Sequence, residues 1–467
     1  MKITFKNNMK GVAKDTLFVS INGENKDEII KENGIKTLYL KCDDAEKMNL
    51  RKLFLLVRKM VMMVKGAKIE KLAFNFKDLK FKNINLTDIE LGEMIGSQLD
   101  FANYEFNVYK TPPKEGFSLI KEIIISGTDK EIEKAILKGN DIAQEVNKTR
   151  TLSNTPGVDM TPKILAQKAL EAVKNFPMKV TILGEKEMKR LKMHAILSIG
   201  RGSDEESKFI IMEYHGGKKN EKPIVLVGKG VTFDSGGMNL KPSSSLLGMN
   251  MDMSGGAAVI HTLALVSKMK IKKNVIGLIP SVENMVSGKS CRPGDVVRSM
   301  SDKTIEILNT DAEGRVILAD ALTYSQKYNP EVVIDIATLT GAAMVALGER
   351  ASAIFTEDDK LAKNLEEVGE KTGDYVWRLP LWEEYENEIK GTLGDFTNIH
   401  NKDSRYGGAI YGAIFLQQFI KDKNGKTLKW AHIDMAPRMT AMAGENLGTG
   451  ALGSPVRLLF KFIEEYK

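Results

Sequence analysis

The chain has 467 residues, of which 42% are hydrophobic and 28% are charged, and its formal net charge at pH 7 is +7. This composition is typical of a soluble globular protein, and the length suits two domains rather than one. No apolar run reaches the roughly 18 residues that a membrane span needs, and a lysine-rich surface is the common cause of such a charge. Cys42 and Cys291 are the only cysteines, so a disulfide framework is excluded and a reducing cytoplasm is the expected location.

Residues 1–128 are predicted to form the smaller of the two domains, with α/β structure. Apolar runs or alternations that indicate strands stand at 1–5, 37–40, 71–74 and 122–125. The first of these lacks the apolar core of a signal peptide. Residues 50–65 are interrupted by basic residues and predict an amphipathic helix. Residues 129–152 follow as a connecting helix, whose apolar face holds Ile132, Ala135, Ile136, Gly139 and Ile142.

Residues 153–467 are predicted to form the larger domain. Strand patterns stand at 179–182, 209–212, 224–227, 275–278, 305–308, 332–334 and 432–434. Helical stretches alternate with them, which predicts a mixed, mostly parallel sheet covered by helices on both faces. In such a sheet, ligands bind at the carboxyl ends of the strands.

The first candidate site follows the strand predicted at 224–227. A glycine-rich segment there holds Lys229, Asp234 and Lys241, and a second glycine-rich segment holds Asp252. Glycines let the backbone and a ligand approach each other closely. A flexible loop with solvated charges is the weaker interpretation, because the neighbouring residues are apolar.

The second candidate site spans residues 309–315, which read NTDAEGR. It lies between the strand pattern that ends at 308 and a helical pattern over 316–328. Taken alone, Thr310 and Glu313 fit a capping box at the start of this helix. A capping box leaves Asp311 and Arg315 unexplained, and the two interpretations are compatible, because a helix begun by Thr310 would hold Glu313 in place.

The two candidate sites together hold four carboxylates, and this number predicts a metal site. Oxygen ligands suit hard and borderline divalent ions, and several carboxylates can hold two such ions about 3.5–4 Å apart. Such a pair activates a water molecule and polarises a carbonyl group. A neutral lysine can serve as a ligand, and a protonated lysine can stabilise a developing oxyanion.

These residues resemble the leucyl aminopeptidase family of cytosolic, hexameric exopeptidases with two metal ions. The resemblance is carried by residues 228–241, 252, 309–315, 337–341, 407–410 and 430–434. It covers the chain from about residue 153 onward, which it identifies as the catalytic domain. It implies a homohexamer that releases N-terminal residues, preferably leucine or other apolar residues, from peptides with a free N-terminus.

The resemblance implies ligands for two divalent ions in each subunit. The readily exchanged ion would be bound by Lys229, Asp234, Asp252 and Glu313. The other ion would be bound by Asp234, Glu313 and Asp311, including the backbone carbonyl of Asp311, so Asp234 and Glu313 would bridge the two ions. Mn²⁺ and Zn²⁺ are the expected ions, with Mg²⁺ and Co²⁺ as further candidates.

The resemblance also implies the catalytic and pocket residues. Lys241 would polarise the scissile carbonyl, and Arg315 would hold a bicarbonate that acts as general base. The free amine of the substrate would bind the exchangeable ion and Asp252. The first side chain of the peptide would enter an apolar pocket lined by Met249, Thr338, Gly341, Ala436 and Met439. Three positions depart from the family's pattern and leave the side-chain preference open: Asn250, Pro437 and Arg438.

Two other functions stay open from the sequence. One is a di-metal hydrolase of esters or phosphates, which the apolar pocket and the lack of an arginine cluster disfavour. The other is a secondary role in nucleic-acid binding, because stretches such as 77–82 are rich in lysine, although acids alternate with them. Histidine-based zinc proteases, serine hydrolases and phosphate-loop proteins are disfavoured, since their motifs do not occur with the required spacing.

Overall fold

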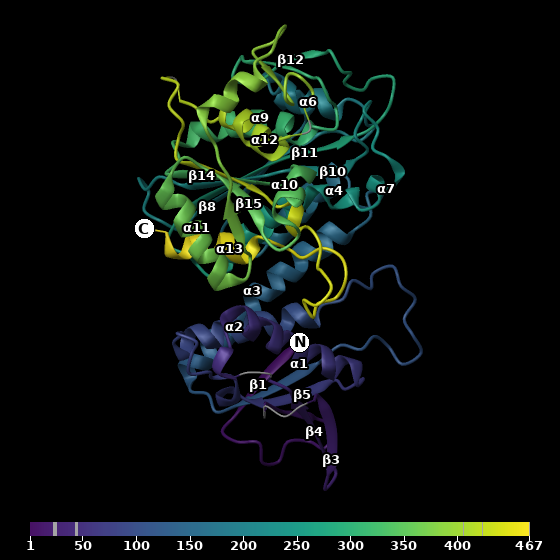
Figure 1. The fold of residues 1–467 in the computed structure, drawn as a ribbon, viewed down its shortest axis with the longest axis vertical. Helices are drawn as coiled ribbons and strands as arrows, with labels where there is room; N and C mark the ends of the chain where they lie inside the picture. Colours follow the sequence, from purple (N-terminus) through teal and green to yellow (C-terminus); the bar gives the residue numbers. More distant parts are fainter. Residues whose placement is uncertain (22–25, 43–44, 405, 423, 467) are drawn as a thin grey trace. The chain divides into compact units, whose positions relative to one another are not determined.

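The computed structural model of the chain describes residues 1–21, 26–42, 45–404, 406–422 and 424–466. The chain divides into two compact units, the first formed by residues 1–147 with 441–450 and the second by residues 148–440 with 451–467. Both units combine sheets with helices (Figure 1), which confirms the predicted α/β class with two domains. The domain boundaries expected near residues 128 and 152 stay predictions. The connecting helix expected between them is present and runs from Lys130 to Asn154.

The first unit is built on a sheet with the strand order β1-β6-β5-β2-β4-β3. Its strands pair in parallel, except that β3 joins β4 at the edge in the antiparallel sense. The strands are β1 (Lys2–Lys6), β2 (Leu17–Ile21), β3 (Glu28–Glu32), β4 (Ile35–Leu40), β5 (Lys71–Asn75) and β6 (Glu122–Ser126). The helices are η1 (Ala45–Lys47), α1 (Leu50–Gly66), η2 (Phe76–Leu79), α2 (Asp88–Asn103) and the part of α3 (Lys130–Asn154) up to residue 147. All four strands and both helices predicted in this part of the chain are present.

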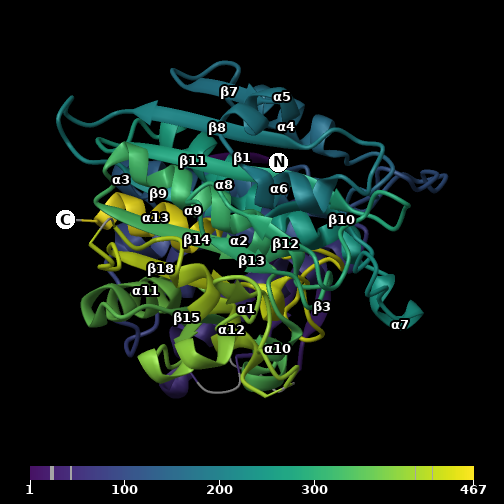
Figure 2. The same cartoon turned by 90° about the horizontal axis from the view of Figure 1, so that it is seen from above.

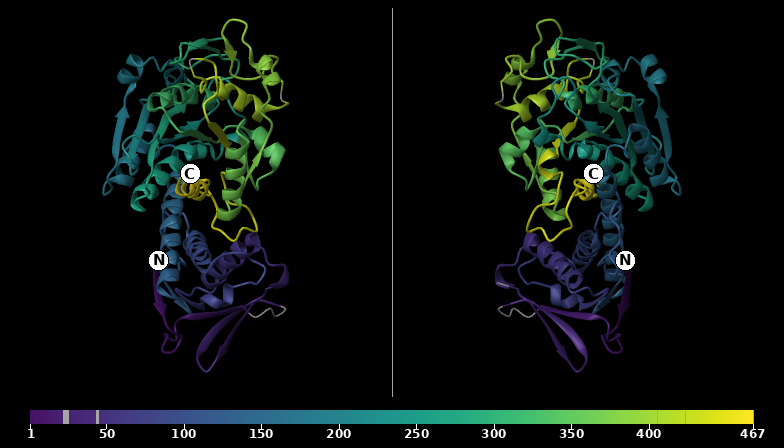
Figure 3. Two further views of the ribbon diagram at one scale, coloured as in Figure 1. Left: turned by 90° about the vertical axis from the view of Figure 1, so that its left-hand side faces the viewer. Right: turned by 90° about the vertical axis from the view of Figure 1, so that its right-hand side faces the viewer.

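The helices of the first unit begin at residues that cap them. The side chain of Asn49 accepts a hydrogen bond from the backbone N–H of Lys52 at the start of α1. Thr87 and Glu90 form a reciprocal capping box at the start of α2. Both helices bury apolar side chains together with the inner strands, and Figure 3 shows the sheet of this unit with the helices packed over it.

The backbones of α2 and α3 approach each other closely at two glycines. A Cβ atom at Gly96 would overlap the backbone of Ile136, and a Cβ atom at Gly139 would overlap the carbonyl oxygen of Glu93. Helix α2 leaves no room for a side chain at residue 139, which explains why the apolar face predicted for α3 includes a glycine there.

The second unit is built on a mixed sheet with the strand order β16-β15-β18-β14-β9-β11-β8-β7, and β10 pairs with the end of β11. Figure 2 shows these strands following one another across the view. The strands are β7 (Lys179–Leu183), β8 (Lys208–His215), β9 (Ile224–Gly228), β10 (Gly230–Asp234), β11 (Asn274–Asn284), β14 (Val332–Ala337), β15 (Ser352–Phe355), β16 (Val376–Arg378) and β18 (Trp430–Asp434). A small second sheet joins β12 (Val296–Arg298), β13 (Thr304–Glu306) and β17 (Phe396–Thr397).

The helices of the second unit alternate with these strands along the chain. The α-helices are α4 (Pro162–Val173), α5 (Glu185–Arg190), α6 (His194–Gly200), α7 (Ser243–Leu246), α8 (Ser254–Lys268), α9 (Glu313–Ser325), α10 (Gly341–Leu347), α11 (Asp359–Thr372), α12 (Gly408–Gln417) and α13 (Val456–Glu465). The shorter 3-10 helices are η3 (Met249–Met253), η4 (Gln326–Tyr328), η5 (Glu383–Ile389) and η6 (Ala436–Arg438).

Helices cover the mixed sheet on both faces. Helices α6, α9 and α12 pack together on one face, and α4, α8, α11 and α13 pack on the other (Figure 1). Strands β9 and β14 are buried along their whole length, as expected for strands that are covered on both sides. The predicted mixed sheet is therefore confirmed, except that the strand expected at 305–308 is β13, which ends at Glu306 and belongs to the small second sheet. None of the helices that the structure describes is long and apolar enough to cross a membrane.

Parallel strands of this sheet end at one edge. Strands β9, β14 and β18 run in the same direction side by side, and β10 runs parallel to the last part of β11. The loops that follow them contain Lys229, Thr338 and other polar residues, and Asp234 ends β10. The fold thus places these side chains at the edge where open sheets bind ligands.

Replacing Gly139 by alanine tests the close approach of α2 and α3. The added methyl group would force two backbones apart, and we expect the free energy of unfolding to fall by about 1–3 kcal/mol. Gly66→Ala is the matched control, because a Cβ atom at Gly66 would have no neighbour within 4 Å. Urea denaturation measures both variants, and equal stability of Gly139→Ala and the wild type would contradict this packing.

Candidate metal centre

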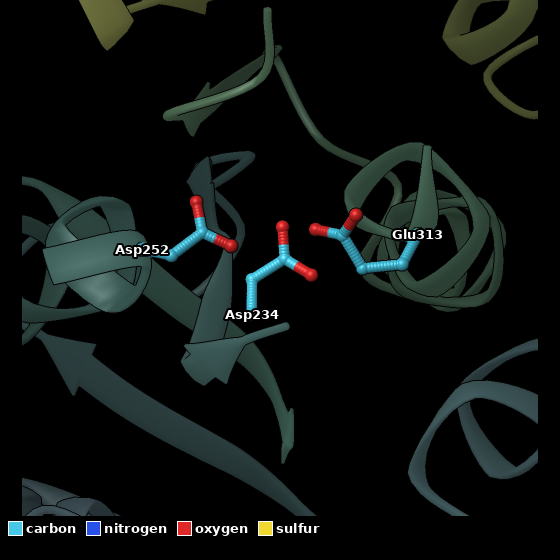
Figure 4. A group of neighbouring side chains, drawn as sticks. All are labelled: Asp234, Asp252 and Glu313. Atoms are coloured by element: carbon cyan, nitrogen blue, oxygen red, sulfur yellow. The ribbon is translucent and has the colours of Figure 1, made fainter. Parts of the chain in front are cut away.

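Three buried carboxylates meet at the edge of the sheet in the second unit. Asp234 ends β10, Asp252 lies in η3, and Glu313 is the first residue of α9. Each offers an oxygen atom, and these atoms all lie within 4.8 Å of one another. Figure 4 shows the three carboxyl groups pointing toward a common space. The fold therefore brings together residues from both candidate segments of the sequence.

Two lysines lie among these carboxylates. The Nζ atom of Lys229 is 2.8 Å from both Asp252 Oδ2 and Glu313 Oε1. The Nζ atom of Lys241 is 2.8 Å from Asp234 Oδ2 and also contacts Asp311.

The charges of this cluster do not balance. Its four carboxylates outnumber its two lysines, so the cluster has a net negative charge when all six groups are ionised. Burial makes this imbalance costly, because water cannot screen the repulsion between the carboxylates. The cluster as a whole therefore favours the binding of further cations.

The pKa values of the cluster reflect this repulsion. Burial and the neighbouring charge of Asp234 raise the pKa of Glu313 to about 8, and burial raises the pKa of Asp252 to about 6. Burial and Asp234 also raise the pKa of Asp311. Burial alone would lower the pKa of Lys229, but the charges of Asp252 and Glu313 outweigh burial and raise it. The carboxylates around Lys229 therefore favour its ammonium form.

Three buried oxygens of the cluster fit the requirements of metal ligands. Asp252 Oδ2, Asp311 Oδ1 and Glu313 Oε1 touch a lysine ammonium group, but none of them accepts a hydrogen bond of good geometry from a residue that the structure describes. Buried carboxylate oxygens need a positive partner, which the lysine ammonium groups supply and which bound metal ions could also supply. A set of carboxylates with a single amine suits divalent ions such as Mn²⁺ and Zn²⁺.

Asp234 is held in place by Asn284, which ends β11. Asn284 Nδ2 donates to Asp234 Oδ1 over 2.8 Å, and it also donates to the carbonyl oxygen of Thr310 over 2.9 Å. The backbone N–H of Gly236 donates to the same oxygen of Asp234. Asn284 was not singled out in the sequence, although a polar residue at the end of a buried strand is a signal that could have found it.

The capping box expected for α9 is not formed. The helix begins at Glu313, and the residue before it, Ala312, provides no capping side chain. The Thr310 hydroxyl instead donates to the carbonyl oxygen of Gly236 and accepts from the N–H of Asn239. The prediction was wrong because hydrogen bonds to a distant loop replace the local ones. Thr310 thereby ties the turn before α9 to the loop that follows Asp234.

Lys229 is held between the end of β9 and two helices. Its N–H donates to the carbonyl oxygen of Ile336, and its own carbonyl oxygen accepts from the N–H of Gly256 at the start of α8. A Cβ atom at Gly314 in α9 would lie 2.6 Å from Lys229 Cε and 2.8 Å from its Nζ. The side chain of Lys229 therefore has room beside the carboxylates only because residue 314 is glycine.

Asp252 is held by the loop that follows β14. The hydroxyl of Thr338 donates to Asp252 Oδ1 over 2.7 Å, and its carbonyl oxygen accepts from Lys229 Nζ. Asp434 at the end of β18 fixes this loop by accepting from the hydroxyl of Thr340 and the N–H of Leu339. Thr338, which the family resemblance places in the substrate pocket, thus also positions a carboxylate.

Arg315 lies on the first turn of α9 and is buried. Its Nη1 atom donates to the carbonyl oxygen of Asn398 over 2.8 Å, whereas its Nε atom has no hydrogen-bond partner among the residues that the structure describes. Burial lowers the pKa of Arg315 to about 10, so the side chain is still charged near neutral pH. A buried guanidinium with an unused donor is suited to bind a small anion.

The predicted pocket residues lie on neighbouring segments of the same unit. Gly341 begins α10 and Ala436 begins η6, and these two helices pack against each other. Met249 begins η3, and Met439 directly follows η6. Both methionines are partly exposed, so neither belongs wholly to the core. Their assignment to one substrate pocket, with Thr338, stays a prediction.

Comparison with known proteins identifies the second unit. Residues 147–460 match the model of the cytosol aminopeptidase family, catalytic domain. A "Probable cytosol aminopeptidase" of Nitrosomonas europaea is 45% identical over 364 residues, which are 77% of this chain and 71% of the relative. A protein of the same name from Rickettsia massiliae is 41% identical over 445 residues, which are 94% of this chain and 87% of the relative.

A solved structure resembles the chain over almost its whole length. The bottromycin maturation enzyme BotP in complex with Mn matches with a TM-score of 0.86 and 27% sequence identity. The match covers 97% of this chain and 99% of that chain.

Replacing Gly314 by alanine tests the position of Lys229. The methyl group would push the Lys229 ammonium away from Asp252 and Glu313, while the flexible end of the lysine can move without disturbing the backbone. We expect the variant to fold but to bind Mn²⁺ about 10–100-fold more weakly. Calorimetric titration with Mn²⁺ measures this affinity.

Gly288→Ala is the matched control, because a Cβ atom there would have no neighbour within 4 Å. Its affinity for Mn²⁺ should equal that of the wild type. An unchanged affinity in Gly314→Ala would show that the position of Lys229 is irrelevant to metal binding.

Proposed function

Since this chain belongs to the cytosol aminopeptidase family and is therefore a metal-dependent aminopeptidase, we propose that it releases leucine and other apolar residues from the N-termini of peptides with two divalent ions in each subunit. The observation that carries the two-metal proposal is the cluster of four carboxylates, three of them buried and Asp311 partly exposed, with only two lysines. Mn²⁺ and Zn²⁺ are the proposed ions, with Mg²⁺ and Co²⁺ as alternatives.

The proposed ligands are those that the family resemblance implies, and the proximity of the charged side chains supports them. Lys229, Asp234, Asp252 and Glu313 would bind one ion, and Asp234, Glu313 and Asp311, including the backbone carbonyl of Asp311, would bind the other. Bound ions would supply an activated water and a polarised carbonyl group. Because the carboxylates around Lys229 favour its ammonium form, it must lose its proton to become a ligand.

We assign Lys241 to the scissile carbonyl of the substrate. Burial alone would lower the pKa of Lys241, but the charges of Asp234 and Glu313 outweigh burial and raise it, so the side chain stays protonated. With these carboxylates engaged as metal ligands, the ammonium group of Lys241 would be available to the carbonyl oxygen of the substrate. A fixed positive charge at this oxygen would stabilise the negative charge that develops on it in the transition state.

We assign Arg315 to a bicarbonate that accepts a proton from the attacking water. This proposal is supported by the free Nε atom of Arg315 and by its burial, which strengthens a charge-assisted hydrogen bond. The hydrogen bond to the carbonyl oxygen of Asn398 fixes the orientation of the guanidinium and leaves its Nε free for the anion.

Asp252 would select peptides with a free N-terminus. Its carboxylate can pair with the α-amine of the substrate, which an internal residue of a peptide lacks. The apolar pocket proposed from Met249, Thr338, Gly341, Ala436 and Met439 would receive the first side chain. Methionines adapt to several apolar shapes, so leucine and methionine are the expected preferences.

The proposed assembly and location follow from the family. We propose that the chain forms a homohexamer and acts in the cytoplasm, and light scattering of the purified protein would measure its mass. Nucleic-acid binding is kept as a secondary alternative, and a gel shift that weakens steeply with salt would reveal it.

The proposed function predicts hydrolysis of a leucyl chromogenic amide that depends on Mn²⁺, Zn²⁺ or Mg²⁺ and stops with a chelator. Glu313→Gln should lower kcat about 1,000-fold, because it removes a carboxylate proposed to bind both ions. Circular dichroism should show that the variant is folded. Lack of chelator-sensitive turnover with every one of these metals would refute the proposed function, and normal kinetics of Glu313→Gln would refute the ligand assignment.

Arg315→Ala should lower kcat about 100-fold, less than the loss of a ligand, because water can partly replace the general base. Rates measured with and without added bicarbonate provide the specific test. The wild type should be stimulated by bicarbonate, and Arg315→Ala should not respond to it. Equal stimulation of both proteins would exclude Arg315 as the anion site.

A further inference from the structure

Asn398 extends the hydrogen bonding of the small sheet beyond the end of its strands. Strands β13 and β17 pair in parallel, and the pairing ends with Glu306 and Thr397. The backbone N–H of Asn398 still donates to the carbonyl oxygen of Glu306 over 3.0 Å. Beyond this point Ile307 still exchanges backbone hydrogen bonds with Gly294 and Asp295, but its segment has no further backbone pairing with the β17 segment among the residues that the structure describes.

The side chain of Asn398 replaces the missing strand partner. Its Oδ1 atom accepts hydrogen bonds from the N–H groups of Leu308 and Asn309, over 2.8 and 3.2 Å. Its Nδ2 atom donates to the carbonyl oxygens of Asn309 and Ala312, over 2.6 and 3.4 Å. Asn398 is fully buried, so these four backbone groups of the turn over 308–312 bond to a buried amide instead of water.

The backbone of Asn398 fixes a second element of the site. Its carbonyl oxygen accepts a hydrogen bond from Arg315 Nη1 over 2.8 Å. One buried residue thus contacts both the turn that presents Asp311 and Glu313 and the guanidinium of Arg315.

We propose that Asn398 is a positioning residue of the aminopeptidase reaction, which sets the turn of the metal ligands and the guanidinium of Arg315 relative to each other. The inference rests on the proposed roles of these residues. Asn398 acts through them and needs no contact with the substrate. Positions of ligands are critical, because loss of a partner that orients a ligand commonly weakens metal binding about 10–100-fold.

Only an amide satisfies the turn in this way. Asparagine offers one acceptor atom and one donor group at a fixed distance, and the turn uses both. Alanine would remove the buried acceptor of the Leu308 and Asn309 N–H groups and one donor to each of the carbonyl oxygens of Asn309 and Ala312, which favours rearrangement of the turn. Aspartate would keep the acceptor but would place a second oxygen against the carbonyl oxygens of Asn309 and Ala312.

Asn401 provides a matched control close by in the chain. Its Nδ2 atom also donates to two backbone carbonyl oxygens, those of Asn387 and Lys390. These bonds lie outside the proposed site and are exposed. Asn401→Ala therefore removes the same kind of interaction without affecting the ligand turn.

The test is a titration of the full-length protein with Mn²⁺, in which electron paramagnetic resonance measures the free ion. The wild type should bind two ions, and Asn401→Ala should match it. Asn398→Ala and Asn398→Asp should bind Mn²⁺ about 10–100-fold more weakly. In the activity assay, both Asn398 variants should lower kcat more than they change KM, and their stimulation by bicarbonate should be smaller than in the wild type.

Each outcome decides the inference. Folded Asn398 variants with the Mn²⁺ affinity and kcat of the wild type would overturn it. Unfolding of both Asn398 variants, with Asn401→Ala folded, would make Asn398 a purely structural residue and would also overturn it. A wild type that binds no pair of Mn²⁺ ions would instead refute the proposed two-metal function on which the inference rests.

Discussion

The mutual repulsion of buried carboxylates is the constraint on which the site depends. Asp234, Asp252 and Glu313 lie within a few ångströms of one another and are almost entirely shielded from water. Such groups avoid ionisation or gather cations, which is why burial and repulsion raise the pKa of Glu313 to about 8. Lys229 and Lys241 supply part of the missing positive charge. The same arrangement prepares the site for divalent ions, which can replace these contacts.

The fold holds this repulsive cluster together with neutral hydrogen-bonding groups. Asn284 fixes Asp234, Thr338 fixes Asp252, and Asn398 fixes the turn before Glu313. Each of these residues stands at or just after the end of a strand, where the backbone is rigid on one side and open on the other. The close approach of the segments depends on small residues such as Gly314. The stable sheet thus holds the carboxylates close together, although their mutual repulsion would otherwise drive them apart.

Local patterns in the sequence predicted much of this structure. The apolar run at 224–227, the charged segment 309–315 and the alternation of strands and helices indicated the mixed sheet and the acidic site, because each pattern lies within a few neighbouring residues. The expectation of a capping box at Thr310 was wrong, because the Thr310 hydroxyl forms hydrogen bonds with Gly236 and Asn239 instead. Asn398 could not be recognised, because its partner Asn309 lies 89 residues away and no local pattern marks such a contact. Asn284, by contrast, ends a buried strand, so polar residues at the ends of predicted strands are a signal that can be added to motifs.

The most direct test of the central claim is anomalous X-ray scattering from crystals of the wild-type protein grown with Mn²⁺. Data collected at the manganese absorption edge should show two peaks per subunit about 3.5–4 Å apart. Both peaks should contact Asp234 and Glu313, and one should also contact Lys229 and Asp252. A single peak between these residues, or peaks elsewhere in the subunit, would contradict the account of a two-metal site.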